Sequence, residues 1–479
     1  MDYRTWRGHW WAPSAPEEKF SGTLYCYENG ELKLELIGGF NLYVEEKVAD
    51  GVGYRVRRDY HDIEIMHGIS GSDIFTLLDN TCTHTSGPRF FDGSITEQNW
   101  SSNRALRGVQ LERVDSQIFV RGHLQLERLI HWSDQSSLKI AIKGGGEGTS
   151  KRSLERESID PITAAHQDMT VALRFLSNNI RYDDHIVANK RLAGGKEWAV
   201  LTCTPNNPVA CKDFDQIQKD LQDLLTLSAY RPCGALSRSL VYETEGEAKD
   251  VEVMGRQIFR TPPSQNDTPG EMILSLSDVE FADIIPKWLN LKSRARTGCN
   301  ILFGLRYIEK GYVGTRLLGV ATAAESIHAA LRSKTSPIPK GEYRKLKKKI
   351  LEAISDERDE LQDFVNKGLH NNPTYNDRML ELASIPDGDA VDLLLGDRQR
   401  WATALKRSRN DLAHANERSA SGDEHSQAFH LLEVTYALLC LVLLSELGVS
   451  REVQKRAVEK NPRISFLSSQ FREGTADHR

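Results

Sequence analysis

The residues with the clearest chemical potential form the run Arg409-Asn410-Asp411-Leu412-Ala413-His414. In a helix, Asn410 and His414 share one face, whereas Arg409 lies about 140° around the axis from His414. A neutral imidazole can accept the proton of a ribose 2′-hydroxyl, and a guanidinium can donate to charge that develops on phosphate oxygens. The carboxamide of Asn410 can orient either group. These three side chains are therefore the minimum set for cleaving RNA without a metal ion.

The spacing by itself is a weak signal. About one R-x4-H is expected by chance in a chain of this length, and the run from Arg4 to His9 repeats the spacing without a helical pattern. We treat this second match as accidental. Cations in the last turn of a helix also complement its dipole without any catalysis. Two interpretations of the C-terminal run therefore stay open: an endoribonuclease site, or a capping feature of a non-catalytic scaffold that binds protein or nucleic acid.

Two groups of cations are candidates for contact with RNA. Four lie on the helix of the motif itself: Arg398, Arg400, Lys406 and Arg407. The run from Lys340 to Lys349 has six Lys or Arg in ten residues, enough to bind several phosphates. A charged helix face can also be merely solvated.

The N-terminal part of the chain must supply strands. Between Gly22 and Gly144 the dominant period is two, as in Glu31–Leu36, which alternates charged residues with leucine. The segment 151–270 mixes strand-like pieces with a helix at 213–230, and it is either a second α+β part or a continuation of the first sheet. The glycine-rich stretch 144–151 lacks the spacing of a phosphate-binding loop and predicts a flexible connector.

Beyond the breaker-rich segment 261–270 the period changes to 3.6, which predicts a helical bundle. We expect a β-rich part at 1–150, an α+β part at 151–270, a helical domain at 276–460 and a flexible tail at 461–479. The predicted helices lie at about 278–307, 313–333, 341–369, 375–384, 390–414 and 424–448. The stretch Val434–Leu444 is apolar on every face, so it must be covered by the bundle or by another chain.

Composition excludes several classes of protein. A formal net charge of −5 in 479 residues excludes a polycation. Seven scattered cysteines without C-x-x-C spacing predict a reducing compartment, the cytoplasm, and neither a disulfide framework nor a zinc site. The longest apolar run is too short for a bilayer, so no membrane contact is expected. The motifs of zinc proteases, serine hydrolases and P-loop enzymes are missing from the sequence, and we expect no cofactor and no metal.

A resemblance joins these observations. The helical C-terminal part with R-N-x-x-x-H resembles the HEPN superfamily of RNases, whose signature is R-x4–6-H, commonly with a polar residue after the Arg. The helix 373–382 is similar to the aromatic-x-x-Arg-hydrophobic-x-x-Leu helix of the ApeA-like branch. The pieces Gly22-Thr23-Leu24-Tyr25, Leu34-Glu35-Leu36-Ile37-Gly38, His67-Gly68 and Phe75-Thr76-Leu77-Leu78-Asp79 are similar to the N-terminal domain of the same anti-phage proteins.

The resemblance implies an α+β multidomain protein, with a β-rich N-terminal sensing region followed by an all-α HEPN bundle. It implies a homodimeric, metal-independent ribonuclease that a phage-derived trigger releases to cut RNA, with tRNA as the expected target. In such a dimer the partner's copy of the motif histidine protonates the leaving 5′-oxygen. Arg409, Asn410 and His414 carry over as catalytic residues. Glu325 is a further candidate, paired either with Arg409 across the bundle or only with a structural cation.

Overall fold

The structure is a computed structural model of the full chain. It describes the following residues, and the account below is restricted to them: 3–41, 43–47, 53–57, 62–86, 96–144, 150–178, 181–187, 190–194, 196–257, 259, 272–308, 311–332, 336–413 and 422–474. The chain divides into two compact units. Unit 1 is β-rich and holds residues 1–225, 233–267 and 281–286, whereas unit 2 is helical and holds 226–232, 268–280 and 287–479.

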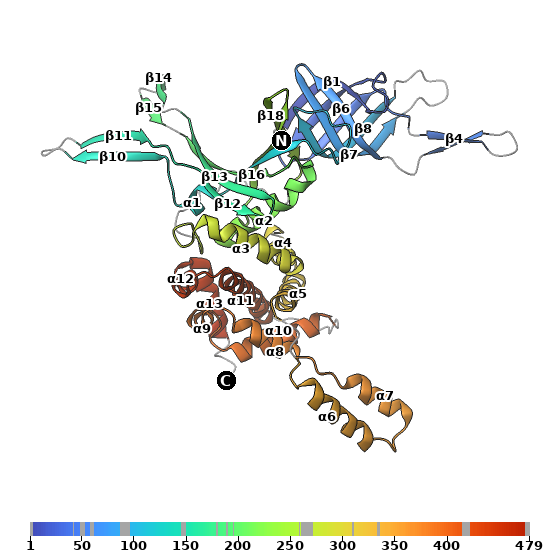
Figure 1. The fold of residues 1–479 in the computed structure, drawn as a ribbon, viewed down its shortest axis with the longest axis vertical. Coiled ribbons are helices and arrows are strands. Elements are labelled where there is room, and N and C mark those ends of the chain that lie inside the picture. The colour runs from blue at the N-terminus through green and yellow to red at the C-terminus, as the bar shows by residue number, and fades with distance from the viewer. Residues whose placement is uncertain are drawn as a thin grey trace. The chain divides into compact units, whose positions relative to one another are not determined.

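Six antiparallel strands of unit 1 close a barrel (Figure 1). They follow the order β8-β3-β2-β1-β6-β7, and β7 pairs with β8 to complete the ring. Alternation fills its interior: Leu32, Leu34 and Leu36 of β3 are buried, while Lys33 and Glu35 point outward and pair at 2.6 Å. The barrel strands are β1 (Tyr3–Trp11), β2 (Phe20–Tyr27), β3 (Leu32–Ile37), β6 (Asp62–Ser70), β7 (Asp73–Ser86) and β8 (Glu97–Arg107).

The same sheet continues beyond the barrel through residues 119–255. Strand β8 pairs with β3 through residues 97–102 and with β18 through residues 104–107, so the sheet branches at this strand. The remaining order is β18-β17-β9-β16-β13-β12. A boundary at residue 150 therefore does not separate two sheets. These strands are β9 (Phe119–Leu126), β12 (Ile162–His166), β13 (Met169–Ser177), β16 (Glu197–Pro205), β17 (Ala235–Thr244) and β18 (Glu247–Gly255).

Helices and two-stranded hairpins complete the described part of this β-rich region. Phe214 of α2 (Cys211–Ala229) lies over Gly122 of β9, where an added Cβ would come within 2.5 Å of the Phe214 ring. The other helix is α1 (Leu129–Ser133). Of the predicted connector at 144–151, Gly144, Ser150 and Lys151 belong to the paired strands of one hairpin, and residues 145–149 fall outside the described part. The hairpins are β4 (Tyr43–Lys47) with β5 (Gly53–Arg57), β10 (Leu138–Gly144) with β11 (Ser150–Arg156), and β14 (Arg181–Val187) with β15 (Lys190–Gly194).

Unit 2 is a bundle of helices, as the change of period predicted. The boundary predicted near residue 270 lies outside the described residues. Three of the predicted helices, 278–307, 341–369 and 390–414, are each split in two, at Ala295, near residues 354–358 and at Gly396. The helices are α3 (Phe281–Arg294), α4 (Arg296–Tyr307), α5 (Val313–Leu331), α6 (Lys340–Ala353), α7 (Asp359–Gly368), α8 (Tyr375–Ala383), α9 (Gly388–Leu395), α10 (Arg398–Ala413), α11 (Gly422–Glu446), α12 (Arg451–Lys460) and α13 (Pro462–Gly474).

The apolar helix α11 is the core of this bundle. Every residue from Val434 to Leu444 is at most 3% exposed, and α5, α9, α10 and α13 of the same unit pack against the helix. The chain itself therefore covers it. Among the described residues, only the segment His425–Glu446 is long and apolar enough to cross a membrane by length and composition, and 78% of its most apolar window is buried inside the protein.

The predicted flexible tail at 461–479 is wrong for residues 462–474. These residues form α13, whose side chains Ile464, Leu467 and Phe471 are buried at helical spacing. Ser468 on the same face donates hydrogen bonds to the carbonyls of Leu393 and Leu394. Because this face covers α9 and α11, the segment is part of the bundle core.

Candidate active site

Helix α10 directs Arg409 toward its neighbours α5 and α8, at the surface of the bundle. Trp401 and Leu405 of this helix are fully buried, and the indole of Trp401 donates to the Thr435 hydroxyl of α11 at 2.9 Å. Arg409 follows Leu405 by four residues, so it lies on the same side of the helix. Near the helix end, Leu412 touches the first turn of α5 at Gly314. The packing of α10 therefore aims Arg409 at α5 and α8.

Glu325 of α5 meets that guanidinium. An Nη2 of Arg409 lies 3.2 Å from Oε2 of Glu325, and Nη1 donates to the Oδ1 atom of Asn410 at 3.4 Å. The ion pair across the bundle, one of the two alternatives left open by the sequence, is thus present. The side chain of Glu325 is 22% exposed and that of Arg409 is 38% exposed. The pair lies at the surface of the bundle, within reach of a ligand.

Helix α8 adds two residues to the site that the sequence-based assignment did not include. Arg378 pairs with the second oxygen of Glu325 at 3.0 Å. The ring of Tyr375 lies under both guanidiniums, 5.4 Å from Arg409 and 6.0 Å from Arg378. A capping box between Thr374 and Asp377 starts the helix at Tyr375 and so sets the direction of both side chains. The signal available in the sequence was the aromatic-x-x-Arg pattern of this helix.

The charges of this cluster do not cancel. One carboxylate, Glu325, faces two guanidiniums, and such an excess of positive charge attracts phosphate. Burial, reinforced by the negative charge of Glu325, raises the pKa of Tyr375, although Arg409 and Arg378 oppose the shift. The phenol therefore stays protonated near neutral pH. Its hydroxyl is buried and has no hydrogen-bond partner among the described residues.

The structure brings some predicted residues together and leaves others apart. Arg409, Asn410 and Glu325 meet, whereas His414 lies outside the described residues. Arg398 lies at the other end of α10, about 16 Å along the axis from Arg409. It binds Asp392 and the carbonyl of Gly388, and so joins α10 to α9.

The other three cations of α10 differ in their surroundings. Arg400 is half-buried, one residue before the buried Trp401. Lys406 and Arg407 are exposed, and Arg407 lies 3.8 Å from Asp411 on the outer side of the helix. By helical geometry Lys406 is about 60° and Arg407 about 160° from Arg409. Lys406 is therefore the nearer of the two to the face that carries Arg409.

A second carboxylate lies beside this cluster. Glu381 of α8 accepts from the Nε2 atom of His328 on α5 at 2.9 Å and lies 3.9 Å from Arg332. His328 is 6% exposed. The two helices are thus joined by two parallel contacts, one through Glu325 and one through Glu381. Sequence reasoning did not predict the second contact.

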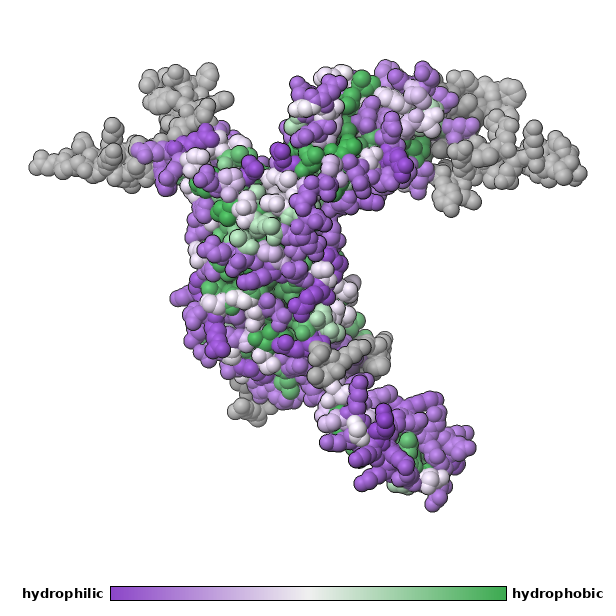
Figure 2. Space-filling view, in the orientation of Figure 1, coloured by the Kyte–Doolittle hydropathy of each residue, from purple (hydrophilic) through white to green (hydrophobic). Residues whose placement is uncertain are grey.

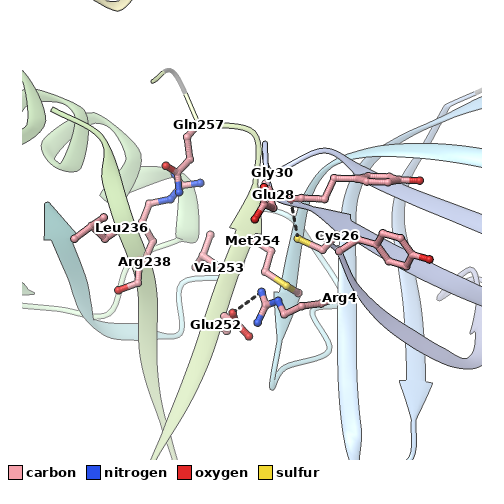
Figure 3. Close-up of a pocket in the computed structure, with 14 residues that line it drawn as sticks. Arg4, Cys26, Glu28, Gly30, Leu236, Arg238, Glu252, Val253, Met254 and Gln257 are labelled. Carbon is pink, nitrogen blue, oxygen red and sulfur yellow. Dashed lines mark hydrogen bonds and ion pairs between the residues drawn. The ribbon is translucent and has the colours of Figure 1, made fainter. Parts of the chain in front are cut away.

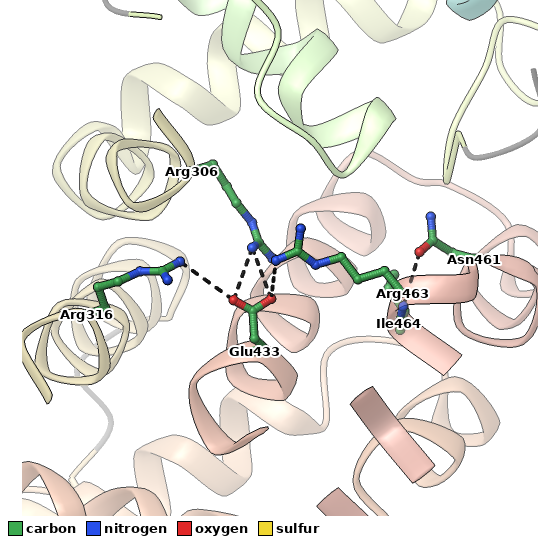
Figure 4. A network of polar contacts seen from close by, with 6 residues as sticks. All are labelled: Arg306, Arg316, Glu433, Asn461, Arg463 and Ile464. Carbon is green, nitrogen blue, oxygen red and sulfur yellow. Dashed lines mark hydrogen bonds and ion pairs between the residues drawn. The ribbon is translucent and has the colours of Figure 1, made fainter. Parts of the chain in front are cut away.

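A third cluster shows how this unit uses arginines in its core (Figure 4). The buried carboxylate of Glu433 on α11 accepts two hydrogen bonds from Arg306, at 3.0 and 3.2 Å, and also binds Arg463 and Arg316. The guanidinium of Arg306 lies 3.7 Å above the ring of Tyr436. Burial opposes ionisation of Glu433, but the guanidiniums outweigh it and hold its pKa below the ordinary value.

The β-rich unit has a pocket of about 440 Å³ between β18 and the barrel strands β1 and β2 (Figure 3). Arg4 and Glu252 both line the pocket and form an ion pair at 2.8 Å. Arg238 also lines it, and the buried Nε of Arg238 has no hydrogen-bond partner in the part of the chain that the structure describes. None of the residues predicted to act on RNA lies in this pocket. Within the described ranges, no group of three or more His, Cys, Asp or Glu could hold a metal ion.

Two protein-family models match the chain. The model of ApeA N-terminal domain 1 matches residues 5–288, more than half of the chain. The chain belongs to the ApeA-like family. The Apea-like HEPN model matches residues 318–453 and so includes Glu325, Tyr375, Arg378 and the whole R-N-x-x-x-H run. The comparisons with curated proteins and with solved structures gave no match.

The family assignment confirms the predicted fold class, a β-rich N-terminal region followed by a helical HEPN bundle. It also connects the chain to a family of anti-phage HEPN nucleases, since HEPN domains are associated with RNase activity. Within the matched HEPN region, the cluster around Glu325 and Arg409 is the best candidate for the active site.

Proposed function

We propose that this protein is an anti-phage endoribonuclease that cuts RNA, with tRNA as its target, without a metal ion or cofactor. It acts in the cytoplasm as a homodimer and is toxic to the infected cell once active. The N-terminal unit restrains it until a phage-derived trigger arrives. The observation that carries the proposal is the unbalanced positive cluster of Arg409, Arg378 and Glu325, one helical turn before His414 in the sequence.

Each residue has a distinct role in the proposed reaction. His414 takes the proton of the ribose 2′-hydroxyl, and the 2′-oxygen attacks the adjacent phosphorus. Arg409 donates to the phosphate oxygens as their negative charge grows, and Glu325 holds Arg409 in position. Asn410 orients the phosphate or the imidazole. The bond to the 5′-oxygen breaks, and this oxygen receives a proton from the partner subunit's His414.

The dimer follows from this chemistry. A single chain offers one motif histidine, whereas the reaction needs one base and one acid. A twofold axis that places two motifs face to face supplies both. Lys406 and Arg407, exposed on the same helix, are proposed to contact the RNA backbone on either side of the cut. Arg400 is a weaker contact of the same kind. We do not include Arg398 among the proposed RNA contacts, because Asp392 of α9 already binds its guanidinium.

The His414→Ala variant tests the proposal. It is expected to abolish RNA scission and toxicity on activation, because no base remains to deprotonate the 2′-hydroxyl. RNA ends are sequenced from cells that express wild type or variant, with and without phage. The wild type should give 2′,3′-cyclic phosphate and 5′-hydroxyl ends, and a chelator should leave the cleavage rate of the purified protein unchanged.

The chain offers a matched control in its accidental motif. His9 is exposed on β1 and ends an R-x4-H run of the same spacing, so His9→Ala should cleave as wild type does. Unaltered scission by His414→Ala would refute the site. Binding of RNA without fragments, by an otherwise folded wild type, would favour the scaffold interpretation instead.

A further inference from the structure

The helices α6 and α7 form a hairpin that is inserted between two helices of the candidate site. α5 carries Glu325 and ends at Leu331, whereas α8 begins at Tyr375. The hairpin contributes no buried residue to the fold. It projects from the bundle with a largely hydrophilic surface (Figures 1 and 2). Since the core does not need these residues, their composition is free to serve another purpose.

The hairpin is held at its base by specific hydrogen bonds. The Asn371 side chain accepts from the backbone N–H of Ile338 at 3.1 Å and donates to its carbonyl at 2.6 Å. The Tyr343 hydroxyl donates to the carbonyl of Leu369 at 2.5 Å, and Lys347 donates to the carbonyl of Asn366. These contacts lie just before Tyr375 in the chain, so the base of the hairpin is tied to the start of α8.

Charge is divided along the hairpin. The base, from Lys340 to Lys349, has six Lys or Arg and one Glu, whereas residues 352–363 have six Asp or Glu and one Arg. Four of the basic residues are exposed and form no ion pair with any described residue: Lys340, Arg344, Lys345 and Lys349. They extend over about 14 Å of helix. A surface that is merely solvated needs no such separation of sign.

We propose that the positively charged segment from Lys340 to Lys349, at the base of the α6–α7 hairpin, binds the phosphate backbone of RNA outside the cleavage site. This inference rests on the proposed function, because the RNA that the hairpin binds is the RNA that the HEPN site cuts. The acidic tip repels RNA and limits the contact to the part of the hairpin nearest Tyr375. The hairpin thus favours RNA long enough to reach from the site onto α6, and a fragment of a few nucleotides gains nothing from it.

The hairpin also exposes an apolar side chain, Phe364, at 75%. A protein partner could use such a residue, but the separated charge favours nucleic acid, since unpaired Lys and Arg release counterions when they bind phosphates. The two partners give different outcomes in the test below.

The test compares two double variants that each remove two exposed charges. Arg344→Gln/Lys345→Gln changes the hairpin, and Arg451→Gln/Lys460→Gln changes α12, where both residues are exposed and unpaired among the described residues. Binding of a full-length tRNA transcript and of a five-nucleotide fragment of its anticodon loop is measured by fluorescence anisotropy at several salt concentrations. The full chain is used with His414→Ala, so that no RNA is cut.

The hairpin variant should bind the tRNA about tenfold more weakly, and the slope of log affinity against log salt should fall by about 1.5, the value for two lost phosphate contacts. Affinity for the fragment should not change. The α12 variant should match the parent for both RNAs. With His414 restored, the hairpin variant should show a raised KM for tRNA and an unchanged kcat.

Equal affinity and equal salt dependence of the hairpin variant and its parent would overturn the inference, even if wild type cuts RNA. The same holds if Phe364→Ala changes the response to phage while the charge variants leave RNA binding unchanged, because the hairpin then binds a protein. If wild type binds and discriminates RNA as described but cuts none, even with extract of phage-infected cells added, the proposed function fails while the hairpin contact stands.

Discussion

Neutralising Glu325 is the perturbation most directly tied to the geometry of the site. Its two oxygens bind Arg378 at 3.0 Å and Arg409 at 3.2 Å. In Glu325→Gln the side chain keeps its size, but one oxygen becomes an NH2 group that faces a guanidinium donor. One of the two contacts must therefore be lost, and the charge that attracted both arginines is gone. We expect Arg409 to lose its fixed position above Tyr375.

The size of the effect follows from the role of that position. A displacement of about 1 Å in a positioned group can cost about 100-fold in rate, which corresponds to about 2.7 kcal/mol of activation free energy. Because Asn410 and the ring of Tyr375 still contact Arg409, we expect kcat to fall about 10- to 100-fold. The free energy of unfolding should change by about 1 kcal/mol or less, since Arg409 and Arg378 are a third or more exposed.

The assay is single-turnover cleavage of tRNA together with thermal unfolding. Glu381→Gln is the matched control, because Glu381 joins the same two helices through His328 and Arg332. It should unfold like Glu325→Gln and cleave like wild type. In an Arg409→Ala background, Glu325→Gln should have no further effect on kcat. An equal loss of rate in Glu381→Gln, or full additivity with Arg409→Ala, would refute the positioning role.

Two further predictions concern stability. Glu433→Gln should destabilise the protein by about 3–5 kcal/mol in chemical unfolding, because it leaves Arg306, 4% exposed, without its counter-charge. The pKa of Glu433 in the folded protein lies below its ordinary value of 4.5. The Glu433 carboxylate therefore stabilises the folded protein above pH 4.5, and this stabilisation is lost as the pH falls through the folded pKa. The Glu433→Gln variant should not show this loss of stability at acidic pH. In α13, Leu467→Ala should lower the free energy of unfolding by about 2–5 kcal/mol, because Leu467 is buried. Phe466→Ala should lower it by less than about 0.5 kcal/mol, because Phe466 is exposed. Equal effects of these two substitutions would contradict the burial of α13.

The periodicity of the sequence predicted the kind of element better than the connections between elements. The alternation in Glu31–Leu36 and the helix at 213–230 are both present. The barrel is closed by the pairing of β7 with β8. The alternation within each of these segments does not show which other strand it pairs with. For the same reason the sequence left open whether residues 151–270 continue the first sheet.

The errors in the helical unit have identifiable causes. A continuous pattern over 390–414 concealed the break at Gly396, whose positive φ of +69° is readily adopted by glycine and rarely by other residues. The predicted tail carried overlooked signals: Pro462 stands at the first position of α13, and Ile464, Leu467 and Phe471 follow at helical spacing. Both signals are local, so a closer reading of the sequence could have found them.

The candidate site was only partly predictable for a different reason. The motif gave Arg409 and Asn410 by their spacing, and the resemblance added Glu325 as a possible partner. Arg378 and Tyr375 were visible only as the pattern of a helix, because nothing in a sequence shows which face of α8 meets α10. The meeting point depends on the packing of three helices.

The contrast between the Glu325 cluster and the Glu433 cluster of the helical unit supports the proposal that Arg409 is more than a structural cation. Where this protein uses a guanidinium for stability, as with Arg306, it buries the group, gives it two bonds to one carboxylate and stacks it on Tyr436. Arg409 is instead 38% exposed and directs two of its five N–H donors, at 3.2 and 3.4 Å, to described partners. A carboxylate shared with Arg378 fixes its position but leaves donors for another acceptor. A phosphate oxygen at the bundle surface fits that demand, because it brings the negative charge that the cluster lacks.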